Sequence, residues 1–504
     1  MPPQMVESGK EWPLLSVVMP VHETPPRLLR EALDSVLAQR YPHWELCVAD
    51  DASTASAVLE ILYDAARRDP RVRVLRRAHR GHIARATNLA LAHARGEFVA
   101  FMDHDDRLPV EALDCVAQLL RSAPLTDLLF TDSDNLDETG ERCNPFFKPS
   151  WDPDLILGQN YLTHFLVVRR PLLQALGGLK QGYEGSQDYD LILRLAEHVL
   201  PQRIRHLPRL LYHWRMVAES VGRGDLALAA RRGREAVSAH LCRRGVRARV
   251  VGAPQAPIYN QVRRALPARL PQVSALLGET LARDALRGLE LGGYPRERLQ
   301  VLVVPQGGWS RALADATGSI VLILTTAFGS ASDVWLQPLV AHALRSEIGL
   351  VGPRIIDAGG CHQGAGLVLG LRGPHGQPAV APAFAGATAG APGYFHRLRL
   401  EHRVSALAGG CLMARRQVLL EAGGLSTLQP AWLADLDLSL RVRAQGLACL
   451  WTPQSTLYLA ASAVPSSGPL VPPPVLAERW AQQLTPDDFY HPALNRRAAD
   501  WQLP

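Results

Sequence analysis

The sequence predicts an α/β fold of two tandem domains, each built on a mostly parallel sheet, the second a degenerate copy of the first. Along residues 14–102, apolar runs of strand length alternate with amphipathic helical segments, which is typical of parallel strands joined by helices. Segments of the first half recur in the second half. A chain of 504 residues is also longer than one hydrophobic core can serve.

The first domain begins with a strand over residues 14–20 that ends at Pro20. Residues 27–39 then repeat apolar side chains at helical spacing, which predicts a helix with one buried face. The strand that closes the series is apolar at each position, so we expect it to be buried on both faces. The elements expected after the first helix are strands over residues 44–49, 72–75 and 98–102 and a helix over residues 83–94.

Carboxylates follow two of the predicted strands: Asp50 and Asp51 follow residues 44–49, and Asp103 and Asp105 follow residues 98–102. Ligands of open α/β sheets bind beyond the carboxyl ends of the strands, so both pairs lie where a ligand is expected. The last two carboxylates would repel each other unless a cation lay between them, and Mg²⁺ or Mn²⁺ suits such oxygen ligands. A turn or helix cap without a ligand remains the alternative at both places.

Four motifs in this order resemble family 2 glycosyltransferases, which have the Rossmann-like GT-A fold. The motifs are SVVMPV at residues 16–21, VADDAS at 48–53, the stretch from Asn88 to GEF at 96–98, and DHDD at 103–106. The resemblance implies a nucleotide-sugar donor whose base contacts Asp51, and a Mg²⁺ or Mn²⁺ ion on Asp103 and Asp105. The other residues expected to bind the donor are Pro20, Val21, Glu23, His82, Arg85, Trp214 and Arg215, with Asp103 shared between donor and metal.

Residues 146–154 and 185–191 resemble a bacterial polysaccharide branch of the family. That branch often has an acidic pair where this chain has Gln187 and Asp188. Transfer with inversion needs a carboxylate to deprotonate the acceptor hydroxyl, and the resemblance assigns this role to Asp188. A helix N-cap is the alternative role for Asp188, and the two roles are compatible.

Residues 212–215 resemble the segment that closes over the donor diphosphate in this family. Arg215 suits a diphosphate because its planar guanidinium group makes bidentate, charge-assisted contacts. For Trp214, a place in the hydrophobic core is the favoured alternative. The QxxRW signature of the family's processive synthases is absent from the sequence, which favours single transfers.

The second half repeats the first without its carboxylates. Residues 164–179 recur as 410–425, residues 188–194 as 435–441, and residues 90–101 as 312–323. However, TTAF at 325–328 replaces DHDD at 103–106, and VPQ at 304–306 replaces ADD at 49–51. Neither replacement can hold a divalent cation with carboxylates. We therefore expect a catalytically silent domain that serves packing, acceptor binding or assembly, since a shared fold does not carry the function with it.

These patterns predict the domain organisation of the chain. We expect a catalytic domain over residues 1–230, a basic helical connector over 231–265, a degenerate domain over 266–463, and a C-terminal linker and tail over 464–504.

The composition and charge of the chain limit the kinds of partner that it is expected to bind. The net charge of +6 comes from arginines spread along the chain, so nucleic acid is not implied, although a weak attraction to an anionic membrane surface is compatible with it. No apolar run approaches the roughly 20 residues that span a bilayer, and the N-terminus has no signal-peptide core. The 7 cysteines form no CxxC pair. We expect a cytoplasmic location, with peripheral association at the inner membrane face as an option.

The function expected from this resemblance is an inverting, metal-dependent hexosyl- or deoxyhexosyltransferase. It would move a sugar from a nucleotide-sugar donor to a lipid-linked or polymeric glycan acceptor of the O-antigen or capsule type. One alternative is a non-catalytic carbohydrate-binding scaffold. A sugar-nucleotide nucleotidyltransferase is disfavoured because residues 21–25, VHETP, lack the Gly-rich basic loop that a triphosphate needs.

Overall fold

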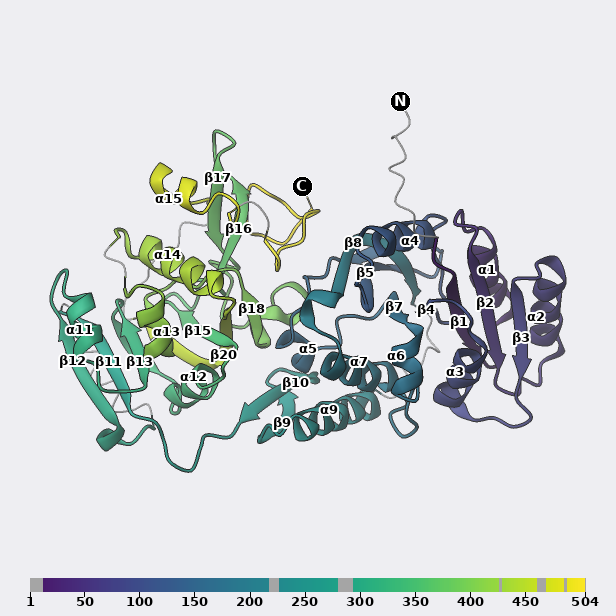
Figure 1. Ribbon diagram of the computed structural model, residues 1–504, viewed down its shortest axis with the longest axis horizontal. Helices are drawn as coiled ribbons and strands as arrows, with labels where there is room; N and C mark the ends of the chain where they lie inside the picture. The colour runs from purple at the N-terminus through teal and green to yellow at the C-terminus, as the bar shows by residue number, and fades with distance from the viewer. Residues whose placement is uncertain are drawn as a thin grey trace. The chain divides into compact units, whose positions relative to one another are not determined.

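The computed structural model describes residues 12–216, 226–279, 293–425, 428–459, 468–484 and 487–503. The chain forms two compact units (Figure 1). The first unit comprises Met1–Trp151 and Asn160–Gly245, and the second comprises Asp152–Gln159 and Val246–Pro504. Among the described residues, no helix combines the length and the apolar character needed to cross a membrane.

The described part of the first unit is built on an eight-stranded sheet in the order β3-β2-β1-β4-β7-β5-β6, with β8 paired to β5. The four strands β1 to β4 run parallel, whereas β7 is antiparallel to both β4 and β5. The strands are β1 (Leu15–Val21), β2 (Trp44–Asp50), β3 (Val72–Arg76), β4 (Phe98–Phe101), β5 (Leu128–Leu136), β6 (Arg142–Phe146), β7 (Leu166–Arg169) and β8 (Ile204–Arg215).

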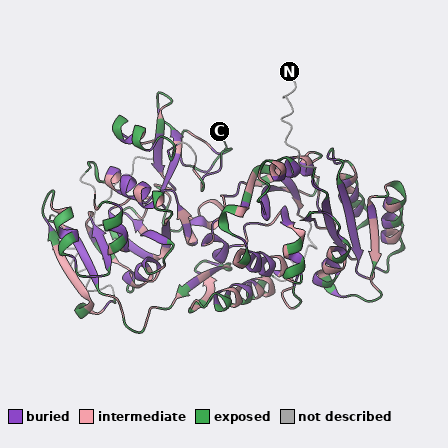
Figure 2. Ribbon diagram, viewed as in Figure 1, coloured by how far each residue is buried: buried purple, intermediate pink, exposed green. Residues whose placement is uncertain are grey.

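Helices cover this sheet, so its central strands are buried, as is every residue of β1 and β2 (Figure 2). The apolar faces of α1, α2 and α4 contribute to the same core as the strands. The described helices of this unit are α1 (Pro26–Leu37), α2 (Ser56–Arg68), α3 (His82–His93), α4 (Ala112–Ser122), α6 (Arg170–Ala175), α7 (Gln187–His198), α9 (Leu226–Arg243) and the short η1 (Pro201–Arg203).

The second unit has a sheet in the order β12-β11-β13-β19-β15-β20-β14, with β18 paired to β20. Its main strands are β11 (Val273–Gly278), β12 (Leu299–Val304), β13 (Ile320–Leu324), β14 (Phe328–Ala331), β15 (Ile348–Ile356), β18 (His402–Val404), β19 (Cys411–Arg415) and β20 (Ala448–Leu459). Two hairpins accompany them, β9 (Ala248–Ala253) with β10 (Ala256–Arg264) and β16 (Leu367–Arg372) with β17 (Pro378–Pro382). The described helices are α5 (Leu155–Gly158), η3 (Arg296–Arg298), α11 (Trp309–Asp315), α12 (Leu336–Ala343), η4 (Tyr394–Arg399), α13 (Arg416–Glu421), α14 (Ala431–Ala444) and α15 (Pro474–Arg479).

The two sheets share one topology. Strand β11 is parallel to β12 and β13, β19 is antiparallel to β13 and β15, and β15 is parallel to β20. This is the pattern of β1 with β2 and β4, of β7 with β4 and β5, and of β5 with β8. The predicted fold class, tandem α/β domains with a degenerate second copy, is confirmed.

Side-chain details recur with the topology. In the first unit the Ser16 hydroxyl accepts a hydrogen bond from the Gly96 backbone N–H at 2.8 Å. In the second, the Ser274 hydroxyl accepts one from Gly318 at the same distance. At both glycines an added Cβ would lie 2.6 Å from backbone atoms, so this close approach of the loop to the first strand requires glycine.

One predicted segment differs in detail from the structure. The connector expected over residues 231–265 is helical only as far as Arg243, because Gly245 has a φ of 68° and the antiparallel hairpin β9–β10 follows. The domain limits at 230, 265 and 463 stay predictions, and part of the linker expected over residues 464–504 lies outside the described residues.

Candidate functional site

A cavity of about 640 Å³, including its open mouth, lies in the first unit at the carboxyl ends of β1 and β4. The side chains that line it include Pro20, Asp103, His164 and Asp188. Because β1 and β4 are neighbouring parallel strands, their ends share one edge of the sheet, where open α/β sheets bind their ligands. The structure therefore brings together three residues predicted for the donor, the metal and the catalytic base.

The two cavity carboxylates occupy positions where a negative charge is disfavoured. Burial, together with the charges of Asp105 and Asp188, raises the pKa of Asp103 to about 7. Burial also raises the pKa of Asp188, against a hydrogen bond from the Asn160 amide at 2.9 Å. Asp188 is in the first turn of α7, after the N-cap residue Ser186, so it does not cap the helix.

The turn after β4 is held by β8. Tyr212 donates a hydrogen bond of 2.5 Å to the buried carboxylate of Asp106, and its oxygen accepts one from the Asp103 backbone at 3.1 Å. The Arg215 backbone donates to Asp106 at 2.8 Å, and its guanidinium donates to the Asp105 carbonyl at 2.8 Å and to Glu31 at 2.5 Å. These contacts fix the backbone that presents Asp103 and Asp105.

Arg215 and Trp214, both predicted to bind the donor, lie outside the residues that line the cavity. Only 4% of the Arg215 side chain is exposed, and its guanidinium group already forms an ion pair with Glu31. Trp214 packs against the hydrophobic core of the unit. The geometry gives Arg215 the role of clamping the acidic turn.

Asp51 anchors the start of α3. Its two carboxylate oxygens accept hydrogen bonds from the Gly81 N–H at 2.8 and 3.0 Å, and the Arg77 guanidinium lies 2.9 Å away. Asp51 is 2% exposed, whereas His82 and Arg85, the next two predicted donor residues, are exposed on α3.

Glu23 and Val21 also have defined structural surroundings. The Glu23 carboxylate accepts hydrogen bonds from the Thr54 N–H at 2.6 Å and from the Thr54 hydroxyl at 2.8 Å, and these bonds lower the pKa of Glu23. Thr54 lies just before α2, so Glu23 fixes the start of that helix. Val21 is buried at the end of β1.

Sequence reasoning missed Lys148 and His164. Lys148 is fully buried, and its ammonium group donates to the carbonyls of His164 at 2.7 Å and Leu162 at 3.5 Å. Burial lowers the pKa of Lys148 to about 7. The ring of His164 stacks on Tyr212 with 4.8 Å between the ring centroids. The sequence feature that indicates a buried amine is a lysine inside the apolar run Phe146-Phe147-Lys148-Pro149.

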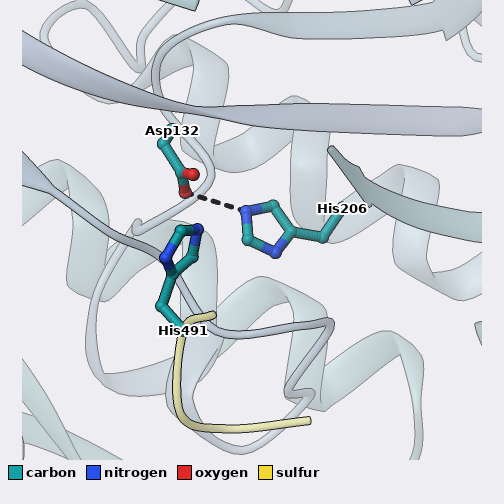
Figure 3. A group of neighbouring side chains, drawn as sticks. All are labelled: Asp132, His206 and His491. Atoms are coloured by element: carbon teal, nitrogen blue, oxygen red, sulfur yellow. Dashed lines mark hydrogen bonds and ion pairs between the residues drawn. The ribbon is translucent and has the colours of Figure 1, made fainter. Parts of the chain in front are cut away.

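Asp132 is a buried carboxylate that holds one side chain and one backbone group of the unit. Its Oδ1 accepts hydrogen bonds from His206 Nε2 at 2.8 Å (Figure 3) and from the Lys148 backbone at 2.9 Å. His206 stacks on Phe130 at 4.8 Å between centroids. Asp132 is therefore a structural carboxylate, in agreement with its place inside β5.

Asp103 and Asp105 have the chemistry of a divalent-cation site. Both are carboxylates, the donors that Mg²⁺ and Mn²⁺ prefer, and Asp105 keeps 18% of its side chain exposed. Burial, and then the neighbouring charges of Asp105 and Asp188, raise the pKa of Asp103. The residues present fit such an ion.

The matching place in the second unit is occupied by backbone. Gly410, which stands where the first unit has His164, accepts a hydrogen bond from the Thr325 N–H at 2.8 Å. The N–H groups of Gly409 and Gly410 donate to Asp435, the counterpart of Asp188, at 3.3 and 3.4 Å. Thr325 and Asp435 thus bond to the chain between them, where Asp103 and Asp188 line a cavity.

The chain is similar to several known proteins. Residues 16–130 match the model of glycosyl transferase family 2. The chain is 36% identical over 482 residues to the O-antigen biosynthesis protein RfbC of Myxococcus xanthus, covering 88% of this chain and 37% of that protein. It is 35% identical over 494 residues to the uncharacterized protein y4gI of Sinorhizobium fredii, covering 90% of this chain and 54% of that protein.

Among solved structures, residues 1–349 of TarS from S. aureus in complex with UDP-GlcNAc have a TM-score of 0.37 and 21% identity. That likeness covers 45% of this chain and 66% of the TarS chain. The chain spans about half the length of y4gI and a little over a third of RfbC.

Proposed function

Because the chain carries a glycosyl transferase family 2 domain over residues 16–130, we propose that its first unit transfers a sugar from a nucleotide-sugar donor to a glycan acceptor. The likeness to an O-antigen biosynthesis protein supports a bacterial surface glycan as the product. We propose a hexosyl or deoxyhexosyl group as the sugar and a lipid-linked or polymeric glycan as the acceptor. The protein would act in the cytoplasm, with peripheral association at the inner membrane face.

The observation that carries this proposal is the cavity shared by Asp103 and Asp188. Asp188 is the proposed base: it takes the proton of the acceptor hydroxyl while that oxygen bonds to the anomeric carbon and the bond to the nucleoside diphosphate breaks. Attack from the face opposite the leaving group inverts the anomeric centre. A carboxylate with a raised pKa is better suited to accept this proton.

On the donor side, we propose that Asp103 and Asp105 hold a Mg²⁺ or Mn²⁺ ion. When bound, such an ion supplies positive charge against the departing diphosphate. Pro20 lines the cavity and Asp51 lies at the neighbouring strand end, so both remain proposed donor residues, with His82 and Arg85 on the exposed start of α3. Val21, Glu23, Trp214 and Arg215 would act through the backbone that they fix.

The alternative function is a non-catalytic carbohydrate-binding scaffold. The second unit favours it for that half of the chain, because Thr325 and Ala327 stand where the first unit has Asp103 and Asp105. The first unit keeps Asp103 and Asp188 at one cavity, which favours an enzyme there.

The decisive variant is Asp188→Asn, which keeps the shape and the hydrogen bond acceptor of the side chain but removes the base. We expect nucleotide-sugar binding within about twofold of wild type and a loss of transfer of roughly 100-fold or more. The measurement is release of nucleoside diphosphate in the presence of an acceptor glycan, after a calorimetric screen of UDP-, GDP- and dTDP-sugars with Mn²⁺.

Asp435→Asn is the matched control, since Asp435 is the buried counterpart in the second unit. It should leave transfer unchanged. Near-normal transfer by Asp188→Asn would exclude Asp188 as the base, and the absence of binding for all donors would contradict the proposed function itself.

A further inference from the structure

A short segment in the first half of the chain belongs to the second unit. The chain leaves the first unit after Trp151, belongs to the second unit over Asp152–Gln159, and returns at Asn160. We call Asp152–Gln159 the strap; it contains the one-turn helix α5. On the first-unit side, the Tyr161 hydroxyl donates to the Ser150 carbonyl at 3.2 Å, which ties the two ends of the strap together.

Within the second unit the strap is held by charge. Asp154 is 4% exposed, and its carboxylate pairs with Arg345 at 2.6 Å and with Arg403 at 2.9 Å. These two guanidinium groups hold the pKa of Asp154 far below its usual range. The Arg403 backbone also donates to Asp152 at 2.8 Å, so the strap is fixed through two of its residues.

Asp152 in turn shapes the strap. Its carboxylate accepts hydrogen bonds from the N–H groups of Asp154 at 2.9 Å and Leu155 at 3.0 Å, which start α5. Further along, Asn260 donates to the Leu157 carbonyl at 3.3 Å. The anchored part of the strap therefore extends to within a few residues of its end at Gln159.

The residue that follows the strap contacts the proposed base. Asn160 donates from its side-chain amide to Asp188 Oδ2 at 2.9 Å. The next residues form a wall of the cavity, which Thr163 and His164 line. The Lys148 side chain donates to the carbonyl of His164. The wall is therefore held by this buried lysine as well as by the strap that precedes it.

We propose that the second unit serves as a positioning device: by anchoring the strap through Asp154, Arg345 and Arg403, it holds Asn160 against the Asp188 carboxylate. This inference rests on the proposed function in that it takes Asp188 as the base. It gives the silent copy a role in catalysis that needs no ligand of its own. Arg345 and Arg403 are positioning residues, since they act on the base through the strap and Asn160.

The physical reason is the orientation of a carboxylate. The Asn160 amide donates to Oδ2 of Asp188, and backbone N–H groups at the start of α7 also bond to the carboxylate, so the Asn160 contact is one of those that hold the group in its orientation toward the cavity. A released strap would let Asn160 change its rotamer and the carboxylate turn. Displacements of about 1 Å at a reacting group lower rates by as much as roughly 100-fold.

The test compares Arg403→Gln with Arg441→Gln in the full chain. Both arginines belong to the second unit, are similarly buried at 21% and 19% side-chain exposure, and pair with buried aspartates. Arg441 pairs with Asp437 within α14 and donates to the carbonyls of Ala422 and Gly424, whereas Arg403 pairs with Asp154 of the strap. We expect Arg403→Gln to lower kcat roughly 10-fold or more, with donor affinity within about twofold of wild type. Arg441→Gln should keep the wild-type kcat.

A double-mutant cycle with Asn160→Ala then separates positioning from general loosening. If Arg403 acts through Asn160, adding Arg403→Gln to Asn160→Ala should cost little further activity. Fully additive losses, or an unchanged kcat in Arg403→Gln, would overturn the inference. Asn160→Ala leaves the second unit intact, so it keeps the proposal testable if Arg403→Gln folds poorly.

Hydrogen–deuterium exchange gives a readout that does not depend on activity. Residues 160–164 and the first turn of α7 should exchange faster in Arg403→Gln than in wild type, and at the wild-type rate in Arg441→Gln. Equal protection in all three proteins would overturn the anchoring. A wild-type chain that transfers no sugar but shows this exchange pattern would contradict the proposed function and leave the anchoring intact.

Discussion

At the residue scale, Lys148 places an amino group in the interior of the first unit, beside the wall of the cavity. Burying a charged amine is unfavourable unless its donors are satisfied, and here the backbone carbonyls of Leu162 and His164 accept from it. The folded state favours the neutral amine, because burial lowers the pKa of Lys148 from 10.5 to about 7. The stability of the unit should therefore depend on pH through this one side chain.

The sign of that dependence follows from proton counts. Between pH 7 and 10.5 the unfolded chain keeps a proton on Lys148 that the folded chain has lost, so stability rises with pH by up to about 1.4 kcal/mol per pH unit. Lys148→Met removes this contribution. The difference in unfolding free energy, wild type minus variant, should increase between pH 7.5 and 9.5 in denaturant titrations. A difference that is constant with pH would mean that Lys148 stays charged in the folded protein.

Asp105 gives a second residue-scale prediction. A donor that binds only the folded state raises the melting temperature by mass action, and Mn²⁺ should be required for this if the ion joins Asp105 to the diphosphate. We expect a UDP-, GDP- or dTDP-sugar with Mn²⁺ to raise the melting temperature of wild type but not of Asp105→Ala. Asp64→Ala, an exposed carboxylate of α2, is the control and should respond as wild type does. An equal shift in Asp105→Ala would exclude the metal assignment.

Residues such as Glu23 and Arg215 mark the limit of reading a site from sequence. Their positions in the motifs predict that both bind the donor. In the structure, their side chains bond to Thr54 and Glu31, which lie 31 and 184 positions away in the chain. A sequence motif gives the residue type at a position, but it does not show which residue, distant in the chain, forms a hydrogen bond or ion pair with that side chain. Asp103 and Asp188 were predictable because strand ends and helix starts fix where such residues lie.

At the element scale, the sequence predicts best what is determined locally. The helices expected over residues 27–39 and 83–94 are α1 (Pro26–Leu37) and α3 (His82–His93), because their apolar faces repeat at helical spacing. The place of β7 between β4 and β5 depends on pairing between distant segments and was not foreseen. Helix α5 is a single turn, too short for a periodic pattern.

The helix α7 and its counterpart α14 share an ion pair that packs each helix against its unit, although the second unit lacks the metal-binding carboxylates. In α7, Arg194 pairs with Asp190 at 2.8 Å and donates to the carbonyl of Gly178. In α14, Arg441 pairs with Asp437 at 2.9 Å and donates to the carbonyl of Gly424. The same ion pair therefore docks each helix on the turn after the preceding short helix, which explains why Asp437 persists in a unit without metal-binding carboxylates.

At the scale of the whole molecule, the two units differ where ligands would bind and agree where the sheet is built. The order of the central strands and the contacts of Ser16 and Ser274 are shared, whereas the edge strands differ. Where Asp103 and Asp188 line a cavity in the first unit, Thr325 and Asp435 make hydrogen bonds to the loop at Gly410 in the second. Backbone N–H groups therefore occupy the Asp435 carboxylate, and Thr325 brings no carboxylate to the place of Asp103.

This contrast predicts the number of binding sites. With Mn²⁺ present, calorimetric titration with the preferred nucleotide sugar should give one site per chain, because Thr325 and Ala327 of the second unit offer no carboxylate where the first unit has Asp103 and Asp105. Asp103→Ala should abolish that site. Thr325→Ala changes the matching position of the second unit and should leave both the stoichiometry and the affinity as in wild type. Two sites in wild type, or a site lost in Thr325→Ala, would mean that the second unit binds donor through groups other than carboxylates and would contradict its catalytic silence.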